Sequence, residues 1–514
     1  MRWAVTPSAE EFRALAADRR VITVATRVFA DADTPVSLYH RLAASRPGTF
    51  LFESVEHGKQ SRWSFIGVRC AATLTSRDGQ AVWDGHVPVG LPGADGSGGD
   101  PLDALRRSLE LLVSGHPQPD LPPLTSGFVG YLGYDIVRRL EQLPQDTVDD
   151  LQVPELAMLL VSELAAVDHE TGEVWLMANA INFDATDERV DETYADAVAR
   201  VHRMVADLAR PPEPLARVRT GPPAQVMART TRQRTSVDFQ DSVRAAIAQI
   251  EAGEAFQIVV SQRFEIANAA DAFEVYRQLR LVNPSPYLYL MRLDEFDIVG
   301  SSPEALVTVR SGEATTHPIA GTRPRGNTAA EDAALEAELL ADEKERAEHL
   351  MLVDLGRNDL GQVCTPGTVE VIEFMQVRRY SHVMHLEAVI TGQLAPGRTA
   401  LDATLACFPA GTLSGAPKVR ALEIIERLEL TRRGTYGGVV GWFDFNGDSD
   451  VAIAIRTALI KDGTAYVQAG AGIVADSVPE LEDAECRNKA AAVLRAILAA
   501  EALTDLDHTA YAAP

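Results

Sequence analysis

Cysteine is scarce in this sequence, occurring at only 4 of 514 positions. No two cysteines are spaced as C-x-x-C, so neither a zinc site nor a disulfide framework is predicted. The scattered residues are Cys70, Cys364, Cys407 and Cys486. Reduced thiols of this kind are typical of a cytoplasmic protein.

Long hydrophobic runs are also missing. The sequence contains no run of about 18 apolar residues, so no transmembrane helix is predicted. The first residues turn polar at positions 8–11 and lack the apolar segment of a signal peptide. We therefore expect a cytoplasmic protein with no membrane partner.

Basic side chains are outnumbered, with 48 Lys and Arg against 73 Asp and Glu and a net charge of −25. Non-specific nucleic-acid binding depends on neutralising phosphates, so no nucleic-acid partner is expected. An anionic substrate would need local cations or a metal ion to offset the negative electrostatic field of the whole molecule.

The length allows two to four domains, or one large duplicated core. Proline pairs at 211–212 and 222–223 cannot lie inside regular elements, because proline lacks a backbone donor. We predict an amino-terminal lobe (1–207), a connector (208–234), a second lobe (235–502) and a tail (503–514).

Hydrophobic periodicity predicts the elements within these lobes. Helices are predicted at 102–112, 237–251, 271–282 and 478–502. Strands are predicted at 173–178, 255–266, 287–292, 297–300, 437–445, 451–460 and 465–470. Hairpin-like strands with intervening helices favour an α+β fold with antiparallel sheets. A nucleotide fold is disfavoured, because 470–472 lacks the later glycine of G-x-G-x-x-G and 411–418 lacks P-loop spacing.

Two acidic pairs have metal-ligand chemistry. Glu345 and Glu348 share one helix face, and Glu482 and Glu485 repeat this spacing on the final helix. Mg²⁺ prefers hard oxygen ligands and retains waters and substrate oxygens, so two glutamates from separate helices suit it. The spacing leaves open that these are solvated surface charges.

Two narrower alternatives also remain open for these glutamates. Glu345 is placed to cap a helix starting at Asp342, and Glu485 to form only an i,i+4 ion pair with Lys489. The final helix shows a capping-box signature at residues 477–480.

Glycines, a histidine and an arginine complete the candidate residues. Gly321 and Gly470 are expected to follow strand ends. Together with glycines at 437–438 and 472 they permit close backbone approach to a carboxylate, although such glycines also mark bulges and turns. His385 alternates with apolar residues. This pattern leaves open that it is a partly buried, hydrogen-bonded histidine with no catalytic role. Arg456 interrupts an apolar strand and is either a carboxylate ligand or an edge-strand charge.

Taken in order, these segments resemble the chorismate-utilising enzymes. The resemblance covers about 237–500 and rests on residues 318–326, 345–359, 383–385, 411–418, 436–438, 470–472 and 485–489. That family includes anthranilate synthase component I, aminodeoxychorismate synthase, isochorismate synthase and salicylate synthase. Residues 51–55 and 62–67 resemble the regulatory region of anthranilate synthase.

The resemblance implies stacked antiparallel β-sheets flanked by helices, and it implies roles for individual residues. Glu348 and Glu485 would hold Mg²⁺, which chelates the ring carboxylate of chorismate, with Glu345 and Glu482 in support. The implied substrate-binding residues are Gly321, Thr322, Tyr436, Arg456, Gly470, Ala471, Gly472 and Lys489. The implied catalytic residues are His385, Glu304, Thr412 and Gln257.

Two positions discriminate among the family's reactions. Relatives that add water resemble one another in having lysine where this chain has Gln257, and a buried lysine can act as a base on water. Aminodeoxychorismate synthases commonly have a nucleophilic lysine at the place of Ala320. The family reaction that these two positions leave is direct attack by ammonia on chorismate. It gives anthranilate and pyruvate and is the first step of tryptophan biosynthesis.

The expected mechanism begins with attack of ammonia on C2 of chorismate. Glu304 protonates the departing C4 hydroxyl, which requires burial to raise its pKa, and His385 assists the elimination of pyruvate. Aminodeoxychorismate synthase component I is the alternative enzyme. A catalytically dead regulatory or scaffold subunit is the alternative class.

The resemblance also implies a partner and an inhibitor. The chain has no second lobe with a cysteine in a sequence context like that of a glutaminase. A separate glutamine amidotransferase subunit is therefore expected to supply ammonia. The elements that resemble the tryptophan-binding site are Glu53, Ser54, Pro286, Tyr287 and Leu288. Leu288 stands where methionine is common, a change between apolar side chains of similar volume.

Overall fold

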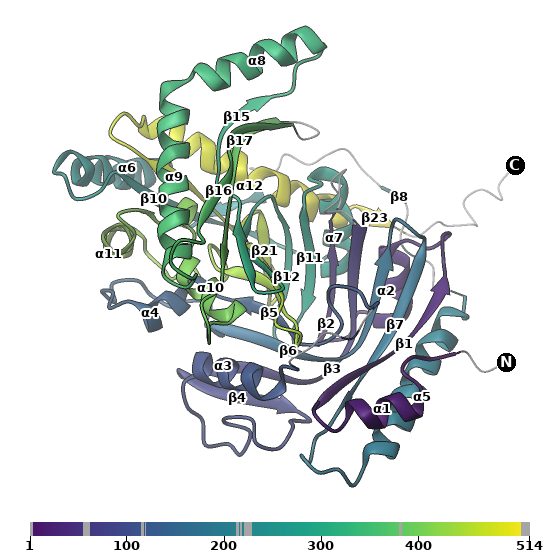
Figure 1. Ribbon diagram of the computed structural model, residues 1–514. Helices are drawn as coiled ribbons and strands as arrows, with labels where there is room; N and C mark the ends of the chain where they lie inside the picture. The colour runs from purple at the N-terminus through teal and green to yellow at the C-terminus, as the bar shows by residue number, and fades with distance from the viewer. Residues whose placement is uncertain are drawn as a thin grey trace, which may run out of the picture.

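A computed structural model describes residues 4–54, 62–114, 118, 120–211, 215, 218–219, 229–379 and 383–504 (Figure 1). The helices of this part of the chain are α1 (Ala9–Leu15), α2 (Pro35–Ala43), α3 (Pro101–Leu112), α4 (Val137–Leu140), α5 (Val190–Leu208), α6 (Ser236–Glu251), α7 (Ala272–Val282), α8 (Ala329–Ala341), α9 (Glu343–Gly361), α10 (Ala400–Cys407), α11 (Lys418–Leu428) and α12 (Pro479–Glu501). Short 3-10 helices span Tyr134–Ile136 and Gly411–Leu413.

The strands alternate with these helices along the chain. They are β1 (Val21–Phe29), β2 (Thr49–Glu53), β3 (Trp63–Arg77), β4 (Gln80–Gly85), β5 (Phe128–Leu132), β6 (Leu156–Asp168), β7 (Glu173–Ile181), β8 (Val218–Arg219), β9 (Thr231–Arg232), β10 (Gln257–Ala267), β11 (Tyr287–Arg292), β12 (Asp297–Ser302), β13 (Ala305–Arg310), β14 (Glu313–Thr316), β15 (Ile319–Pro324), β16 (Glu370–Arg379), β17 (Val383–Gln393), β18 (Gly415–Ala416), β19 (Val439–Phe443), β20 (Ser449–Ile453), β21 (Thr457–Lys461), β22 (Thr464–Ile473) and β23 (Leu503–Thr504).

Pairing between these strands is antiparallel. Two series of paired strands, here called the two sheet arms, begin at the amino-terminal strands β3 and β6. One arm runs β3–β2–β11–β12–β21–β22–β10. The other runs β6–β5–β19–β20–β13–β14–β17. Strands from both halves of the chain therefore belong to one hydrogen-bonded network, and the lobe boundaries proposed above stay a prediction.

The core fills three layers around these arms. One cluster of buried side chains lies between the arms and includes Phe50, Tyr131, Tyr289 and Trp442. A second cluster packs α2, α5, α7 and α12 against one arm, and a third packs α3 and α10 against the other. Burial of these apolar faces drives the layering. The prediction of an α+β fold with stacked antiparallel sheets and flanking helices is confirmed.

Three local predictions differ from the structure. The strand expected at 451–460 is two strands, β20 and β21, because Arg456 between them has a positive φ of 51°. The capping box expected at 477–480 is absent: Val478 is the N-cap without a side-chain bond, and Ser477 Oγ accepts from the amide of Val474. Gly321 and Gly470 lie within β15 and β22, not after strand ends.

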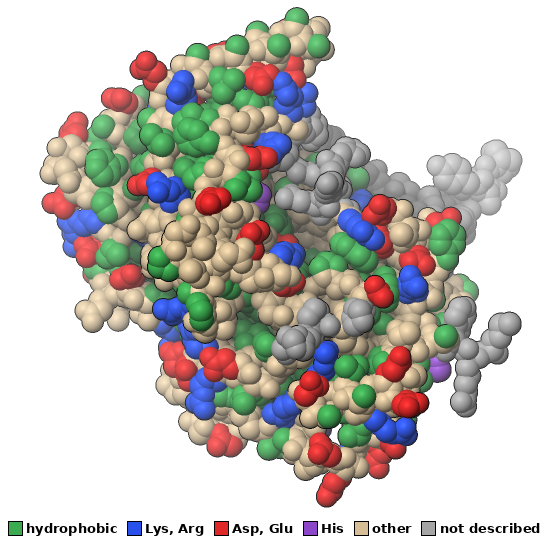
Figure 2. Space-filling view, viewed as in Figure 1, with side chains coloured by type: hydrophobic (Ala, Val, Ile, Leu, Met, Phe, Trp, Pro, Cys, Tyr) green, Lys and Arg blue, Asp and Glu red, His purple; other side chains and the backbone are tan. Residues whose placement is uncertain are grey.

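Acidic and basic side chains are interspersed on the side of the molecule shown in Figure 2. Over the ranges described above, no helix is both long and apolar enough to cross a membrane.

Candidate active site

The first acidic pair lies at the start of α9. The side chain of Asp342 accepts hydrogen bonds from the amides of Lys344 and Glu345, so Asp342 and not Glu345 caps the helix. Burial raises the pKa of Glu345, and the charges of Glu348 and Asp342 raise it further. Crowded carboxylates of this kind favour a bound cation, which would relieve their repulsion.

The second acidic pair lies at the start of α12. Burial raises the pKa of Glu482, the charge of Glu485 adds to this rise, and the charge of Lys344 acts against it. Lys344 belongs to α9, so the first turns of α9 and α12 lie close enough for their charges to interact. The ion pair that spacing left open is present, with 2.6 Å between Lys489 Nζ and Glu485 Oε1.

Both helices border one short segment of the paired strands β10 and β22. On the α9 side, Gln257 Nε2 donates to Glu348 Oε1 at 3.1 Å, and a side chain at Gly472 would come within 2.6 Å of the same Gln257 nitrogen. On the α12 side, Lys489 Nζ donates to the carbonyl of Gly470 at 3.0 Å. The two acidic pairs are therefore joined through the backbone of 470–472.

The donor set fits a hard divalent cation. Among the residues described above, no group of three or more His, Cys, Asp or Glu side chains is arranged as a complete metal site. Two facing carboxylate pairs nevertheless suit Mg²⁺, because this ion usually keeps waters and substrate oxygens as its other ligands. Burial is the main cause of the raised pKa values of Glu345 and Glu482, and neighbouring carboxylates, whose repulsion a cation would relieve, raise them further.

Arg456 lies at the base of this segment, between β20 and β21. Burial lowers the pKa of Arg456, while the charges of Tyr436 and Glu485 oppose that change. The hydroxyl of Tyr436 points at the same backbone, since a side chain at Gly470 would come within 2.8 Å of it. A partly buried guanidinium beside a phenol and backbone amides can bind a carboxylate.

A carboxyl group with a raised pKa, that of Glu304, lies close enough to Lys489 for its pKa to be affected by that charge. Burial raises the pKa of Glu304 to about 7, although a hydrogen bond from Thr412 and the charge of Lys489 both lower it. Thr412, in the 3-10 helix before β18, holds this carboxyl through Oγ1. Near neutral pH a substantial fraction of Glu304 is therefore protonated, as a general acid must be.

His385 lies on β17 beside the bulge of β15. Its Nδ1 is 2.9 Å from the carbonyl oxygen of Gly321 and 3.0 Å from Thr322 Oγ1. Burial lowers the pKa of His385, so the neutral ring dominates at pH 7. Gly321 has a φ of +66°, and a side chain there would contact Glu345 Oε2 at 3.2 Å, which places this bulge against the first acidic pair.

A separate cavity of about 370 Å³ lies between the two sheet arms. Its lining includes all five residues that resemble a tryptophan site: Glu53, Ser54, Pro286, Tyr287 and Leu288. Glu53 accepts from Tyr276 and from Arg280 Nε at 3.1 Å, and Ser54 Oγ is buried without a hydrogen-bond partner in the described part of the chain.

Comparison with known proteins identifies the family of this chain. The chorismate binding enzyme family matches residues 23–495. Anthranilate synthase component 1 of Mycobacterium tuberculosis is 59% identical over 510 residues, covering 97% of each chain. The chain belongs to the anthranilate synthase component 1 family. Members of this family are chorismate-utilising lyases.

Other members of the anthranilate synthase component 1 family are similar along nearly the whole chain. The protein of Mycolicibacterium smegmatis is 58% identical and covers 98% of this chain and 95% of its own. The crystal structure of anthranilate synthase component I from Streptococcus pneumoniae matches with a TM-score of 0.72 at 34% identity, covering 86% of this chain and 94% of that one.

Sequence reasoning missed several residues that support the sites of this anthranilate synthase family member. Arg433 and Glu429 lie beneath the active site, and Arg310, His317 and Asp450 line the cavity between the arms. Their sequence signal is weak, because a single charge after a helix or within a strand usually faces solvent.

Proposed function

We propose that this chain converts chorismate and ammonia to anthranilate and pyruvate in the cytoplasm. The reaction would use Mg²⁺ and ammonia released from glutamine by a separate amidotransferase. The relatives are named component 1, which supports a second component as partner.

One observation carries this proposal: Glu348 of α9 and Glu485 of α12 reach the segment 470–472 through Gln257 and Lys489, beside a partly buried arginine, Arg456. Chorismate has two carboxylates, one directly on its ring and one on the enolpyruvyl side chain. Such a site offers a cation position for one carboxylate and a guanidinium for the other.

Bound Mg²⁺ would be held by Glu348 and Glu485, with Glu345 and Glu482 beside them, and would neutralise and orient the ring carboxylate. Tyr436, Arg456 and the amides of 470–472 bind the enolpyruvyl carboxylate. Gly321 and Thr322 line the ring, and Lys489 adds positive charge close to the acidic residues. Positioning of this kind supplies much of the rate enhancement of an addition reaction.

The chain's own residues then move two protons. Ammonia adds at C2 while the C4 hydroxyl leaves as water, with the proton supplied by Glu304, and the new amine releases one proton to water. In the second step His385 takes the C2 proton as the bond from C3 to the enolpyruvyl oxygen breaks, and the ring becomes aromatic. The enolpyruvate that leaves takes up one proton at its methylene carbon and becomes pyruvate.

Amination is favoured over the other family reactions. Gln257 is engaged with Glu348 and has no basic amine to activate water. Ala320, on β15 directly before Gly321, cannot act as an amine nucleophile. The incoming nucleophile must therefore be an external amine.

Tryptophan is the proposed feedback inhibitor, bound in the cavity between the arms. The cavity offers the carboxylate of Glu53 and the hydroxyl of Ser54 among aromatic and aliphatic side chains. Strands β2 and β11 of its wall join the two halves of the chain, with Glu53 opposite Leu288. A ligand bound in this cavity can inhibit turnover only to the extent that it binds one relative arrangement of the two halves more tightly than another.

The purified chain incubated with chorismate, Mg²⁺ and ammonium tests the proposal by mass spectrometry of the product. Anthranilate is expected, and glutamine in place of ammonium should give no product from this chain alone. Aminodeoxychorismate as the end product would favour the alternative enzyme, and absence of any product would favour a regulatory subunit.

A further inference from the structure

Arg433 and Glu429 form a buried ion pair just beyond the end of α11. Only 3% of Arg433 and 8% of Glu429 is exposed. Arg433 Nε donates to Glu429 Oε2 at 2.9 Å and Nη2 donates to Oε1 at 2.6 Å. This bidentate ion pair fixes the plane of the guanidinium as well as its position.

The remaining hydrogen bonds of Arg433 reach backbone that carries active-site residues. Nη1 donates to the carbonyl of Leu413 at 2.7 Å, and Nη2 donates to the carbonyl of Val259 at 2.7 Å. Leu413 directly follows Thr412, the partner of Glu304. Val259 lies two residues beyond Gln257, the partner of Glu348.

The guanidinium also touches the substrate-binding tyrosine. The central carbon of Arg433 lies 5.6 Å from the centre of the Tyr436 ring, within the range of a cation–π contact. Arg433 therefore contacts the turn that presents Tyr436 as well as the backbone on either side of the pocket.

Glu429 continues the connection into the paired strands. Its Oε1 accepts from the amide of Ser261 at 2.8 Å and from Ser261 Oγ at 2.7 Å. Ser261 faces Gly470 across the β10–β22 pairing, and Gln468 Nε2 donates to Ser261 Oγ at 2.8 Å. The carboxylate thus anchors the strands that carry the 470–472 segment.

We propose that Arg433 and Glu429 are a positioning pair that holds Thr412, Tyr436 and the β10–β22 segment in the arrangement needed for reaction. This inference rests on the proposed function of the site. The pair does not contact the reacting atoms. A buried ion pair contributes little net stability, because desolvation offsets its attraction. Its hydrogen bonds to Leu413 and to Val259 and Ser261 of β10 instead restrict the geometry of these two segments.

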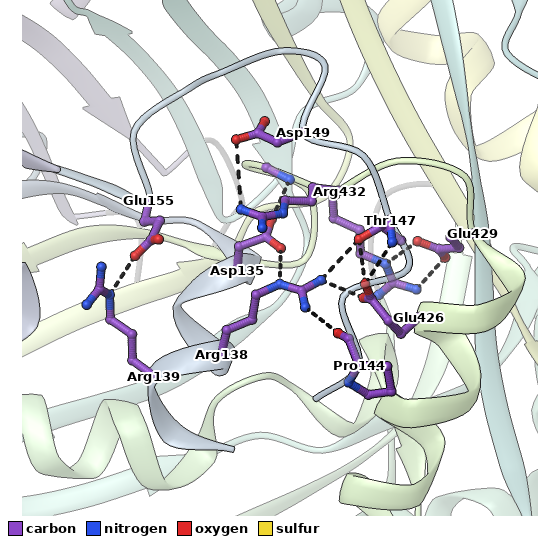
Figure 3. Close-up of polar contacts among 12 residues, drawn as sticks. Asp135, Arg138, Arg139, Pro144, Thr147, Asp149, Glu155, Glu426, Glu429 and Arg432 are labelled. Carbon is purple, nitrogen blue, oxygen red and sulfur yellow. Dashed lines mark hydrogen bonds and ion pairs between the residues drawn. The ribbon is translucent and has the colours of Figure 1, made fainter. Parts of the chain in front are cut away.

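A second ion pair on the same helix offers a matched control. Arg138 Nη2 lies 2.5 Å from Glu426 Oε2, and Figure 3 shows this pair close to Glu429. The other bonds of Arg138 reach Asp135, just before α4, and Pro144 and Thr147, in the segment that follows α4. Arg138 therefore anchors α11 directly and reaches the turn of Arg433 only through Asp135, which accepts from the amide of Gly434 at 3.1 Å.

Arg433→Lys and Arg138→Lys are compared for kcat, for the KM of chorismate and for melting temperature. Misplacement of reacting groups by about 1 Å costs on the order of 100-fold in rate, so Arg433→Lys should lower kcat by about that factor with a smaller change in KM. Arg138→Lys should lower the melting temperature comparably and leave kcat within a few-fold. If Arg433→Lys does not fold, Glu429→Gln replaces it, since it keeps the side-chain shape.

A double variant that combines Arg433→Lys with Thr412→Val distinguishes a positioning role of Arg433 from a general loss of rigidity in the fold. If Arg433 acts through Thr412, the double variant should have a kcat no lower than that of the more impaired single variant. Losses that multiply, or a wild-type kcat in Arg433→Lys, would overturn the inference alone, provided that the wild-type chain makes anthranilate. A wild-type chain that makes none would overturn the proposed function and this inference with it.

Discussion

Thr412 Oγ1 donates a hydrogen bond of 3.1 Å to Oε1 of Glu304, linking side chains 108 residues apart. This bond stabilises the charged carboxylate, while burial stabilises the protonated form more strongly and raises the pKa to about 7. The balance between the two effects sets the fraction of Glu304 that can act as an acid.

The first prediction concerns this balance. A general acid works when protonated, so turnover should fall as pH rises through about 7. Thr412→Val removes a bond that lowers the pKa, so the pKa should rise and the falling limb should move to higher pH. Initial rates measured against pH at constant free ammonia test this, and Glu304→Gln should lose roughly 10²–10⁴-fold in kcat.

Thr404→Val is a suitable control for that experiment. Among the described residues, the Thr404 hydroxyl bonds only the carbonyl of Ala400 within its own helix, α10. Its pH profile should match that of the wild-type chain. A Thr412→Val profile with an unmoved or acid-shifted limb would contradict the assignment of Glu304 as the acid.

The second prediction concerns His385. Burial lowers its pKa, so the neutral imidazole is available as a base at pH 7. His385→Ala should retain chorismate binding, measured by equilibrium titration, and lose about 10²–10⁴-fold in turnover. His86→Ala, which removes a histidine in edge-to-face contact with Phe183 away from this site, should leave turnover unchanged. Full activity in His385→Ala would refute a role in elimination.

The third prediction concerns the cation. Glu345→Gln, Glu348→Gln and Glu485→Gln should each raise the Mg²⁺ concentration needed to stabilise the chain against heat, by roughly 10–100-fold for the supporting residue Glu345. Chelation of Mg²⁺ should abolish turnover. Glu343→Gln, at an exposed position in the same turn of α9, is the matched control and should behave as wild type. Equal Mg²⁺ responses in all four variants would rule out this site.

The fourth prediction concerns feedback inhibition. Ser54 Oγ is buried in the wall of the cavity and lacks a partner among the described residues, so a bound amino acid would supply one. Loss of one such hydrogen bond costs about 1 kcal/mol, so Ser54→Ala should weaken tryptophan inhibition by about five- to tenfold. Turnover without tryptophan should stay close to wild type. Inhibition that is unchanged in Ser54→Ala would place the inhibitor elsewhere.

Much of the local structure could be predicted from the sequence. The helix expected at 102–112 is α3, the helix at 271–282 is α7 and the strand at 287–292 is β11, each within one residue of the expected bounds. Periodicity works here because each element buries one continuous apolar face. It failed at 451–460, where Arg456 adopts a left-handed backbone conformation that an apolar pattern cannot reveal.

The sequence by itself determined the residue types of the site, the absence of an amine at Gln257 and Ala320, and the family that these motifs resemble. Only the tertiary structure decided which of the charges converge. The pKa of Glu304, the approach of α9 to α12 and the burial of Arg433 depend on residues far apart in the chain. Local spacing specifies which face of an element a side chain occupies, but desolvation and charge proximity arise when distant elements pack together.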